Sequence, residues 1–129
     1  YLDSELRFDG ETLDFVNNHS DGSSQIIAKF DAISGPHGNG TLPNGDYIVN
    51  NLRNRTVSGF TRDGVGFSLD LEPLFKTQRT LLRIHPDGNT FGTLGCIGII
   101  ENATRLNQFQ NIMRYYLHNI SNSIKLNVN

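Results

Sequence analysis

Helical periodicity occurs in only one segment of this chain, and this limits the folds available to it. Apolar residues recur at spacings of three and four between positions 106 and 120, which is the period of an amphipathic helix. Asn102, just before the segment, is a residue type that caps helix N-termini. We therefore expect one substantial helix near the C-terminal end. Its apolar residues are Leu106, Phe109, Ile112, Met113, Tyr116, Leu117 and Ile120.

The rest of the chain consists of short apolar or alternating segments separated by turn signals, which is typical of β structure. Thirteen glycines supply many of these turns, and Asp9-Gly10 between two apolar segments predicts a hairpin. Pro43 and Gly45 bracket another turn that feeds a strand. The sequence thus predicts a mainly β fold. The other expected strands cover residues 5–8, 12–16, 24–33, 65–71, 80–84 and 123–128.

The length of the chain and its net charge restrict its domain organisation and its binding partners. A chain of 129 residues has the size of one domain, so we expect a single domain over residues 1–129. The formal net charge of −2 gives no positive field to attract a phosphate backbone, so we expect no nucleic-acid partner. The apolar stretches are too short for a membrane span. Because the chain starts with Tyr1 rather than Met, we expect that an upstream segment was removed.

The only cysteine of the chain, Cys96, lies eleven residues after His85 in a glycine-rich stretch. A cysteine attacks substrates as the thiolate, and a nearby histidine can take up its proton and later return it. A strand, a loop and a second strand can fit into eleven residues, and this arrangement can bring the side chains of His85 and Cys96 together. Gly95 and Gly98 keep the backbone beside the sulfur narrow, so that amides near Gly95 and Cys96 can approach a substrate oxyanion.

A structural interpretation of Cys96 remains open at this point. Cysteine next to Ile97 is equally typical of a small buried core residue, and many histidines only satisfy a local hydrogen bond. Asp87 could orient His85 as a third catalytic residue, although its place after Pro86 is more typical of a turn. A zinc site of His37 with His85, Asp87 and Cys96 would match no common ligand spacing, so we expect no metal and no cofactor.

Two motifs resemble the L,D-transpeptidase catalytic domain, also called YkuD-like. Residues 93–97 read Thr-Leu-Gly-Cys-Ile, similar to the family's Ser/Thr-His-Gly-Cys followed by a branched apolar residue. Residues 41–47 read Thr-Leu-Pro-Asn-Gly-Asp-Tyr, similar to its earlier Thr-Pro-X-Gly-X-Tyr/Phe segment. The resemblance implies a curved or sandwich-like sheet with the cysteine loop at one end and a packed C-terminal helix.

The sequence departs from the family at two places. Leu94 replaces the usual histidine before Gly-Cys, so the role of base falls on His85, and the arginine that commonly follows the cysteine is missing. Arg83 or Arg79 is a substitute for binding the substrate carboxylate, with Thr93 and Tyr47 as further substrate contacts. Phe60 and Phe67 either line a cleft or belong to the core. The short loop between His85 and Cys96 resembles type VI secretion effectors and phage members of the superfamily.

The resemblance implies acyl transfer on peptidoglycan stem peptides through a cysteine thioester. Water as acceptor makes an L,D-carboxypeptidase, and an amine makes an L,D-transpeptidase or a D-amino-acid exchanger. Such a protein acts in the periplasm or outside the cell after secretion or translocation, and as an antibacterial effector it would have an immunity or secretion partner. Two alternatives stay open: a cysteine peptidase that cuts another stem-peptide bond, and a non-catalytic β-rich module that binds the wall or a partner protein.

Overall fold

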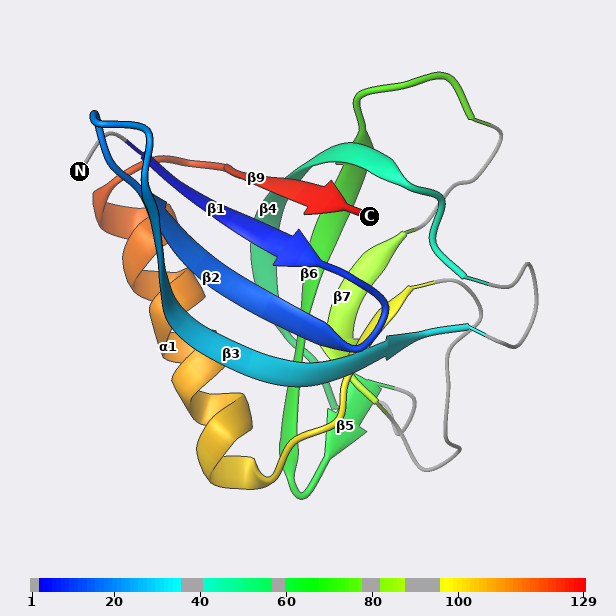
Figure 1. Cartoon of the computed structure of the whole chain (residues 1–129). Coiled ribbons are helices and arrows are strands. Elements are labelled where there is room, and N and C mark those ends of the chain that lie inside the picture. The colour runs from blue at the N-terminus through cyan, green and yellow to red at the C-terminus, as the bar shows by residue number, and fades with distance from the viewer. Residues whose placement is uncertain (1–2, 36–40, 57–59, 78–81, 88–95) are drawn as a thin grey trace.

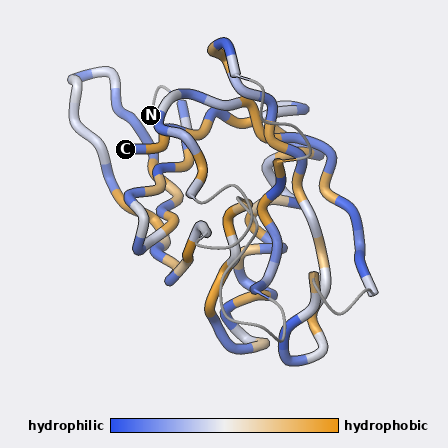
Figure 2. The backbone as a smooth tube through the Cα atoms, turned by 90° about the vertical axis from the view of Figure 1, so that its right-hand side faces the viewer, coloured by the Kyte–Doolittle hydropathy of each residue, from blue (hydrophilic) through white to orange (hydrophobic). Residues whose placement is uncertain are grey.

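The computed structural model describes residues 3–35, 41–56, 60–77, 82–87 and 96–129. It is mainly β with one helix, as the sequence predicts. Figure 2 shows hydrophobic and hydrophilic residues alternating along the strands, which gives each strand one apolar face. These faces form one hydrophobic core together with the helix. The strands are β1 (Asp3–Phe8), β2 (Thr12–Asn18), β3 (Ser24–Ser34), β4 (Gly45–Asn54), β5 (Thr61–Arg62), β6 (Val65–Pro73), β7 (Arg83–Pro86), β8 (Ile97–Ile99) and β9 (Ile124–Val128).

The sheet closes on itself. Its strands follow the order β4-β9-β1-β2-β3-β8-β7-β6-β5, and an additional pairing of β4 with β6 joins the two ends, leaving β5 as an appendage of β6. Closure removes the unpaired edges that an open sheet would expose. Most neighbours are antiparallel, but β1 with β9 and β7 with β8 are parallel pairs. The curved sheet that we expected is therefore a closed one (Figure 1).

The β1–β2 hairpin forms where the sequence predicts it. The carboxylate of Asp9 accepts hydrogen bonds from the backbone N–H groups of Glu11 and Thr12, and Gly10 adopts a φ of 97°, which favours glycine. The hydrogen bond from Thr12 is the largest of the influences that lower the pKa of Asp9. Turn chemistry therefore sets the register of the first two strands.

The helix α1 (Ala103–Asn119) begins at the expected cap, because Asn102 accepts a hydrogen bond from the backbone N–H of Arg105. It lies along one side of the sheet (Figure 1). The ring of Phe109 packs edge-on against Phe30 of β3 at 5.2 Å and stacks with Phe67 of β6 at 5.8 Å. The helix thus contributes to the core inside the curve of the sheet.

The strand predictions differ from the structure mainly around the site. We expected a strand over residues 80–84, and the described strand begins at Arg83, while residues 80 and 81 lie outside the described part of the chain. The strands β5 and β8 are two and three residues long, too short to produce a periodic signal. No helix in the described residues has the length and apolar character needed to cross a membrane.

Candidate active site

The imidazole of His85 lies on β7 and is almost fully buried, with 5% of the residue exposed. Its Nδ1 is 2.7 Å from the carbonyl oxygen of Pro86. Because a carbonyl oxygen only accepts hydrogen bonds, Nδ1 is the donor, and the proton of the neutral ring sits there. This leaves Nε2 with a lone pair, the form that a general base needs.

The surroundings of His85 keep its ring neutral. Burial has the largest effect and lowers the pKa of His85 from its ordinary 6.5, because a charged imidazolium loses its hydration there. The positive charge of Arg83 adds to the lowering, whereas the hydrogen bond to Pro86 and the charge of Asp87 oppose it. Near pH 7 His85 is therefore neutral and able to accept a proton.

The residue Cys96 comes directly before β8, which runs parallel to β7. The register pairs Ile84 with Ile97 and His85 with Gly98. Cys96 itself lies at a bend, just outside the paired residues of β8. The residue is half-buried. The fold therefore puts Cys96 at the start of the strand that pairs with the strand of His85.

The residue Asp87 directly follows β7 and lies inside the protein. It is fully buried, and its backbone N–H donates to the carbonyl of Ile99 across 3.0 Å. The hydrogen bond that orients the ring of His85 goes to the backbone of Pro86 instead. Asp87 thus acts on His85 through its charge. The rest of the turn in which we expected it lies outside the described residues.

An aromatic ring with two arginines covers His85. The ring of Phe60, next to β5, lies 4.5 Å from the imidazole, centroid to centroid, at 40°. The guanidinium carbons of Arg55 and Arg83 lie 5.4 and 5.9 Å from the centre of the same ring, within the range of a cation–π interaction. Phe60 therefore helps to desolvate the histidine, and of the two arginines on its ring Arg83 also acts on the pKa of His85 through its charge.

The guanidinium of Arg83 is only partly engaged. It shares Asp70 with Arg53: the Nε of Arg83 is 3.5 Å from the Asp70 carboxylate, while Arg53 approaches to 2.8 Å. This Nε has no hydrogen-bond partner among the described residues. Burial acts to raise the pKa of Asp70, but the hydrogen bond from Asn51 and the two arginines outweigh it and lower the pKa. Because this Nε is buried, its lack of a partner gives no support for substrate binding, and a contact of Arg83 with a substrate carboxylate stays a prediction.

The structure does not support a substrate contact by Tyr47. The residue is completely buried, its hydroxyl donates to the carbonyl of Pro43 across 2.6 Å, and its ring packs edge-on against Phe75. A side chain with no exposed surface cannot meet a substrate, so we remove Tyr47 from the site. Phe67 is likewise a core residue. Of the three aromatic residues considered, only Phe60 lies against His85.

Other predicted site residues lie outside the described part of the chain, namely Thr93, Gly95, His37 and Arg79. Within the described part, no three histidine, cysteine, aspartate or glutamate residues are arranged to hold a metal ion. Arg55 was missed by the sequence analysis. It follows β4, and its Nε donates to the hydroxyl of Ser68 on β6. The sequence signal was Gly66: a Cβ there would come within 2.0 Å of the Arg55 carbonyl oxygen.

Comparison with known proteins shows the fold only. No family model matches the sequence, and no curated protein matches it significantly. The solved structure of Bdellovibrio bacteriovorus Bd1075 is similar, with a TM-score of 0.70 and 12% sequence identity over 98% of this chain. This chain spans 47% of that protein. The similarity shows that this arrangement of strands and helix occurs in another protein.

Proposed function

We propose that this chain is a cysteine-dependent acyl transferase that acts on peptidoglycan stem peptides as an L,D-carboxypeptidase, an L,D-transpeptidase or a D-amino-acid exchanger. The observation that supports the proposal is the parallel pairing of β7 with β8, because His85 lies on β7 and Cys96 directly precedes β8. The hydrogen bond from Nδ1 to Pro86 supports it, because it leaves Nε2 to handle the proton of a thiol. The two sequence motifs supply the substrate class.

The chemistry requires one proton carrier and one nucleophile. Nε2 of His85 takes the thiol proton, and the sulfur of Cys96 attacks the carbonyl carbon between the diamino acid at stem position three and the terminal D-alanine. The tetrahedral intermediate collapses to a thioester as the C–N bond breaks, and His85 gives its proton to the departing amine. Water or an amine then attacks the thioester, His85 accepts the proton of this acceptor, and the thiol is restored.

Further groups would bind the substrate or stabilise the tetrahedral intermediate. The guanidinium groups of Arg55 and Arg83 lie on the ring of Phe60 and are suited to the carboxylates of a stem peptide. Amides near Gly95 and Cys96 are our candidates for stabilising the oxyanion, and Thr93 stays a predicted contact. Such a substrate places the protein in the periplasm or outside the cell.

In the decisive experiment the protein is incubated with purified tetrapeptide and pentapeptide muropeptides, and the masses of the products are measured by mass spectrometry. We expect tetrapeptides to lose D-alanine or exchange it, and pentapeptides to be largely spared, while Cys96→Ser protein leaves both intact. Equal consumption of both substrates would contradict the L,D assignment. Products cut at another bond would favour the cysteine peptidase.

A native-state labelling experiment addresses the alternative of a binding module. We expect a small alkylating reagent to label Cys96 rapidly, because a nucleophile has to be accessible and ionisable. Labelling only after denaturation, together with unchanged muropeptides, would favour the non-catalytic module.

A further inference from the structure

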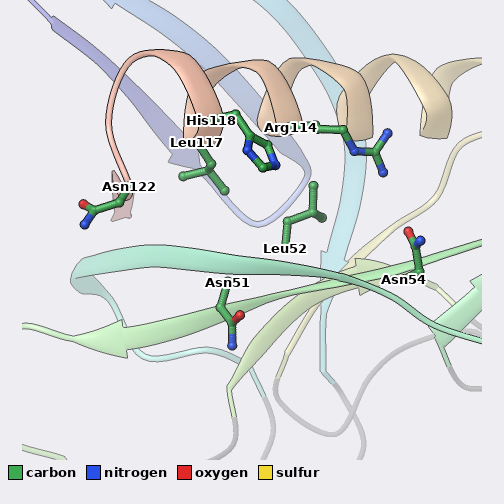
Figure 3. Close-up of a pocket in the computed structure, with 7 residues that line it drawn as sticks. All are labelled: Asn51, Leu52, Asn54, Arg114, Leu117, His118 and Asn122. Atoms are coloured by element: carbon green, nitrogen blue, oxygen red, sulfur yellow. The ribbon is translucent and has the colours of Figure 1, made fainter.

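A hollow lies between β4 and the C-terminal half of α1, and neither His85 nor Cys96 lines it. Its volume is about 310 Å³, at the small end of the range of about 300–1,000 Å³ typical of ligand pockets. Figure 3 shows Leu117 and His118 pointing from the helix toward β4, and Leu52 pointing back at them. Among the residues that line this hollow, called here the helix–strand pocket, are Leu52, Asn54, Arg114, Leu117, His118 and Asn122.

An irregularity in β4 shapes the strand side of this pocket. The pairing of β4 with β6 shifts register between Asn50 and Arg53, and Asn51 adopts a φ of 62°. Bulges of this kind re-aim side chains and often lie beside functional sites. Here Asn51 turns away from the helix to donate to Asp70, and Leu52 faces the helix. The bulge therefore places an apolar floor beneath the polar groups of the pocket.

The pocket has a positive charge, on Arg114, that has no counter-ion among the described residues. Arg114 is exposed and makes no hydrogen bond or ion pair with any described residue. His118 lies one helical turn away on the same face of the helix, and its ring offers a further N–H donor. None of the described residues that line the pocket is acidic. An anion in the pocket would supply the counter-charge that Arg114 lacks among these residues.

The other side chains of the pocket indicate which chemical groups a ligand would carry next to its anionic group. Asn54 and Asn122 carry amides that both donate and accept hydrogen bonds, and Asn54 is already positioned by a hydrogen bond from Gln110. Leu52 and Leu117 offer room for a small apolar group. The planar fork of Arg114 suits the two oxygens of a carboxylate. A carboxylate next to a peptide amide and a small side chain matches all three kinds of contact.

We propose that the helix–strand pocket binds the C-terminal carboxylate of a short peptide, with Arg114 on the carboxylate and Asn54, which lies at the same end of the pocket (Figure 3), on the neighbouring amide. The size of the pocket limits the bound part to about two residues. This site does not depend on the proposed function, because its residues are separate from Cys96 and His85. It would be a binding site whether or not the chain is an enzyme.

The test is a titration followed by NMR, with N-acetyl-L-alanyl-L-alanine as the probe. This peptide lacks the diamino acid and the D-alanine of the proposed substrate, so failure of the catalytic proposal does not affect the result. We expect saturable shifts of the backbone amides of Asn54, Arg114 and His118. The same peptide with an amidated C-terminus should bind far more weakly, and inorganic phosphate should also bind more weakly. Equal affinity for the amidated peptide or for phosphate would overturn the proposal.

Variants separate a built site from general charge attraction. Arg114→Gln should weaken binding by about ten- to hundredfold, because a hydrogen-bonded charge is lost. Arg114→Lys should give an intermediate loss, since it keeps the charge and loses the fork. Lys29→Gln is the matched control: it removes the same charge from an exposed position on β3 and should leave binding unchanged. Equal effects of Arg114→Gln and Lys29→Gln would overturn the proposal.

Discussion

The Nδ1 atom of His85 donates to the carbonyl oxygen of Pro86, its immediate neighbour on β7, across 2.7 Å. A backbone carbonyl stays an acceptor at every working pH and is not removed by a side-chain substitution. The tautomer of His85 is therefore fixed by the strand that carries it. The buried carboxylate of Asp87 affects the charge of the ring but is not needed to orient it, which separates this site from a triad with an acidic third member.

The first prediction concerns the stability of the protein below about pH 7. Burial lowers the pKa of His85 in the folded protein below the 6.5 of an exposed histidine. Between these two pKa values the unfolded chain binds more protons than the folded one, so the free energy of unfolding rises with pH. The contribution of His85 is complete above about pH 7 and decreases as the pH falls. Urea unfolding at a series of pH values measures this slope.

The control for this slope is His85→Gln, which should flatten the profile below about pH 7. The carboxylates with lowered pKa values, Asp9, Asp21 and Asp70, do not interfere. Their stabilisation is present above their ordinary pKa of 3.8 and is lost only at lower pH. An unchanged slope in the His85→Gln protein would show that His85 does not titrate as its burial requires.

The second prediction concerns the ring that covers His85. Phe60→Ala exposes the imidazole to water, so its pKa should rise toward 6.5, and the acidic limb of the pH–rate profile should move to higher pH. NMR titration of the His85 ring protons measures the pKa directly. Phe60→Leu keeps an apolar cover and should change the pKa less. A pKa that does not move in Phe60→Ala would mean that other parts of the protein desolvate His85.

Those parts of the fold that depend on local patterns could be predicted from the sequence. The helix follows from its period of three and four, the first hairpin from Asp9-Gly10, and the longer strands from alternation. The spacing of His85 and Cys96 selected these two residues as candidates, and their catalytic role stays a prediction. What the sequence could not supply was the parallel pairing of β7 with β8, because strand order depends on contacts between distant segments and not on local periodicity.

The surroundings of the histidine were harder to predict for the same reason. Phe60 comes from a different part of the chain and lies against His85, with Arg55 on its ring, because β6 joins β4 to β7 in the sheet. Gly66 within a strand was a usable sign of close backbone approach, but it does not say which residue approaches. Tyr47 shows the opposite error, since its likeness to a family motif suggested a substrate contact and its burial makes it a core residue.

The third prediction tests this correction. Tyr47→Phe removes a buried hydroxyl that donates to Pro43, so the free energy of unfolding should fall by about 1 kcal/mol. The KM and kcat for a tetrapeptide substrate should remain at wild-type values. Urea unfolding and steady-state kinetics on the same preparation check both parts. A raised KM with unchanged stability would return Tyr47 to the substrate site.

The fourth prediction tests whether Cys96 and His85 act as one unit. If His85 takes up the thiol proton, alkylation of Cys96 should stay fast near neutral pH, below the pKa of about 8.5 of a free cysteine. His85→Ala should slow this alkylation at neutral pH and restore it at high pH, where the thiol ionises without help. The rate of iodoacetamide labelling, followed by mass spectrometry across the pH range, measures both effects.

Kinetics of the double variant complete this test. Cys96→Ser should abolish turnover while the protein stays folded, because a hydroxyl is much harder to ionise than a thiol. His85→Ala should cost orders of magnitude in kcat. The double variant should be hardly worse than either single one, since the members of one catalytic unit act non-additively. Additive losses, or an active Cys96→Ser protein, would mean that the pairing of β7 with β8 does not join these residues in catalysis.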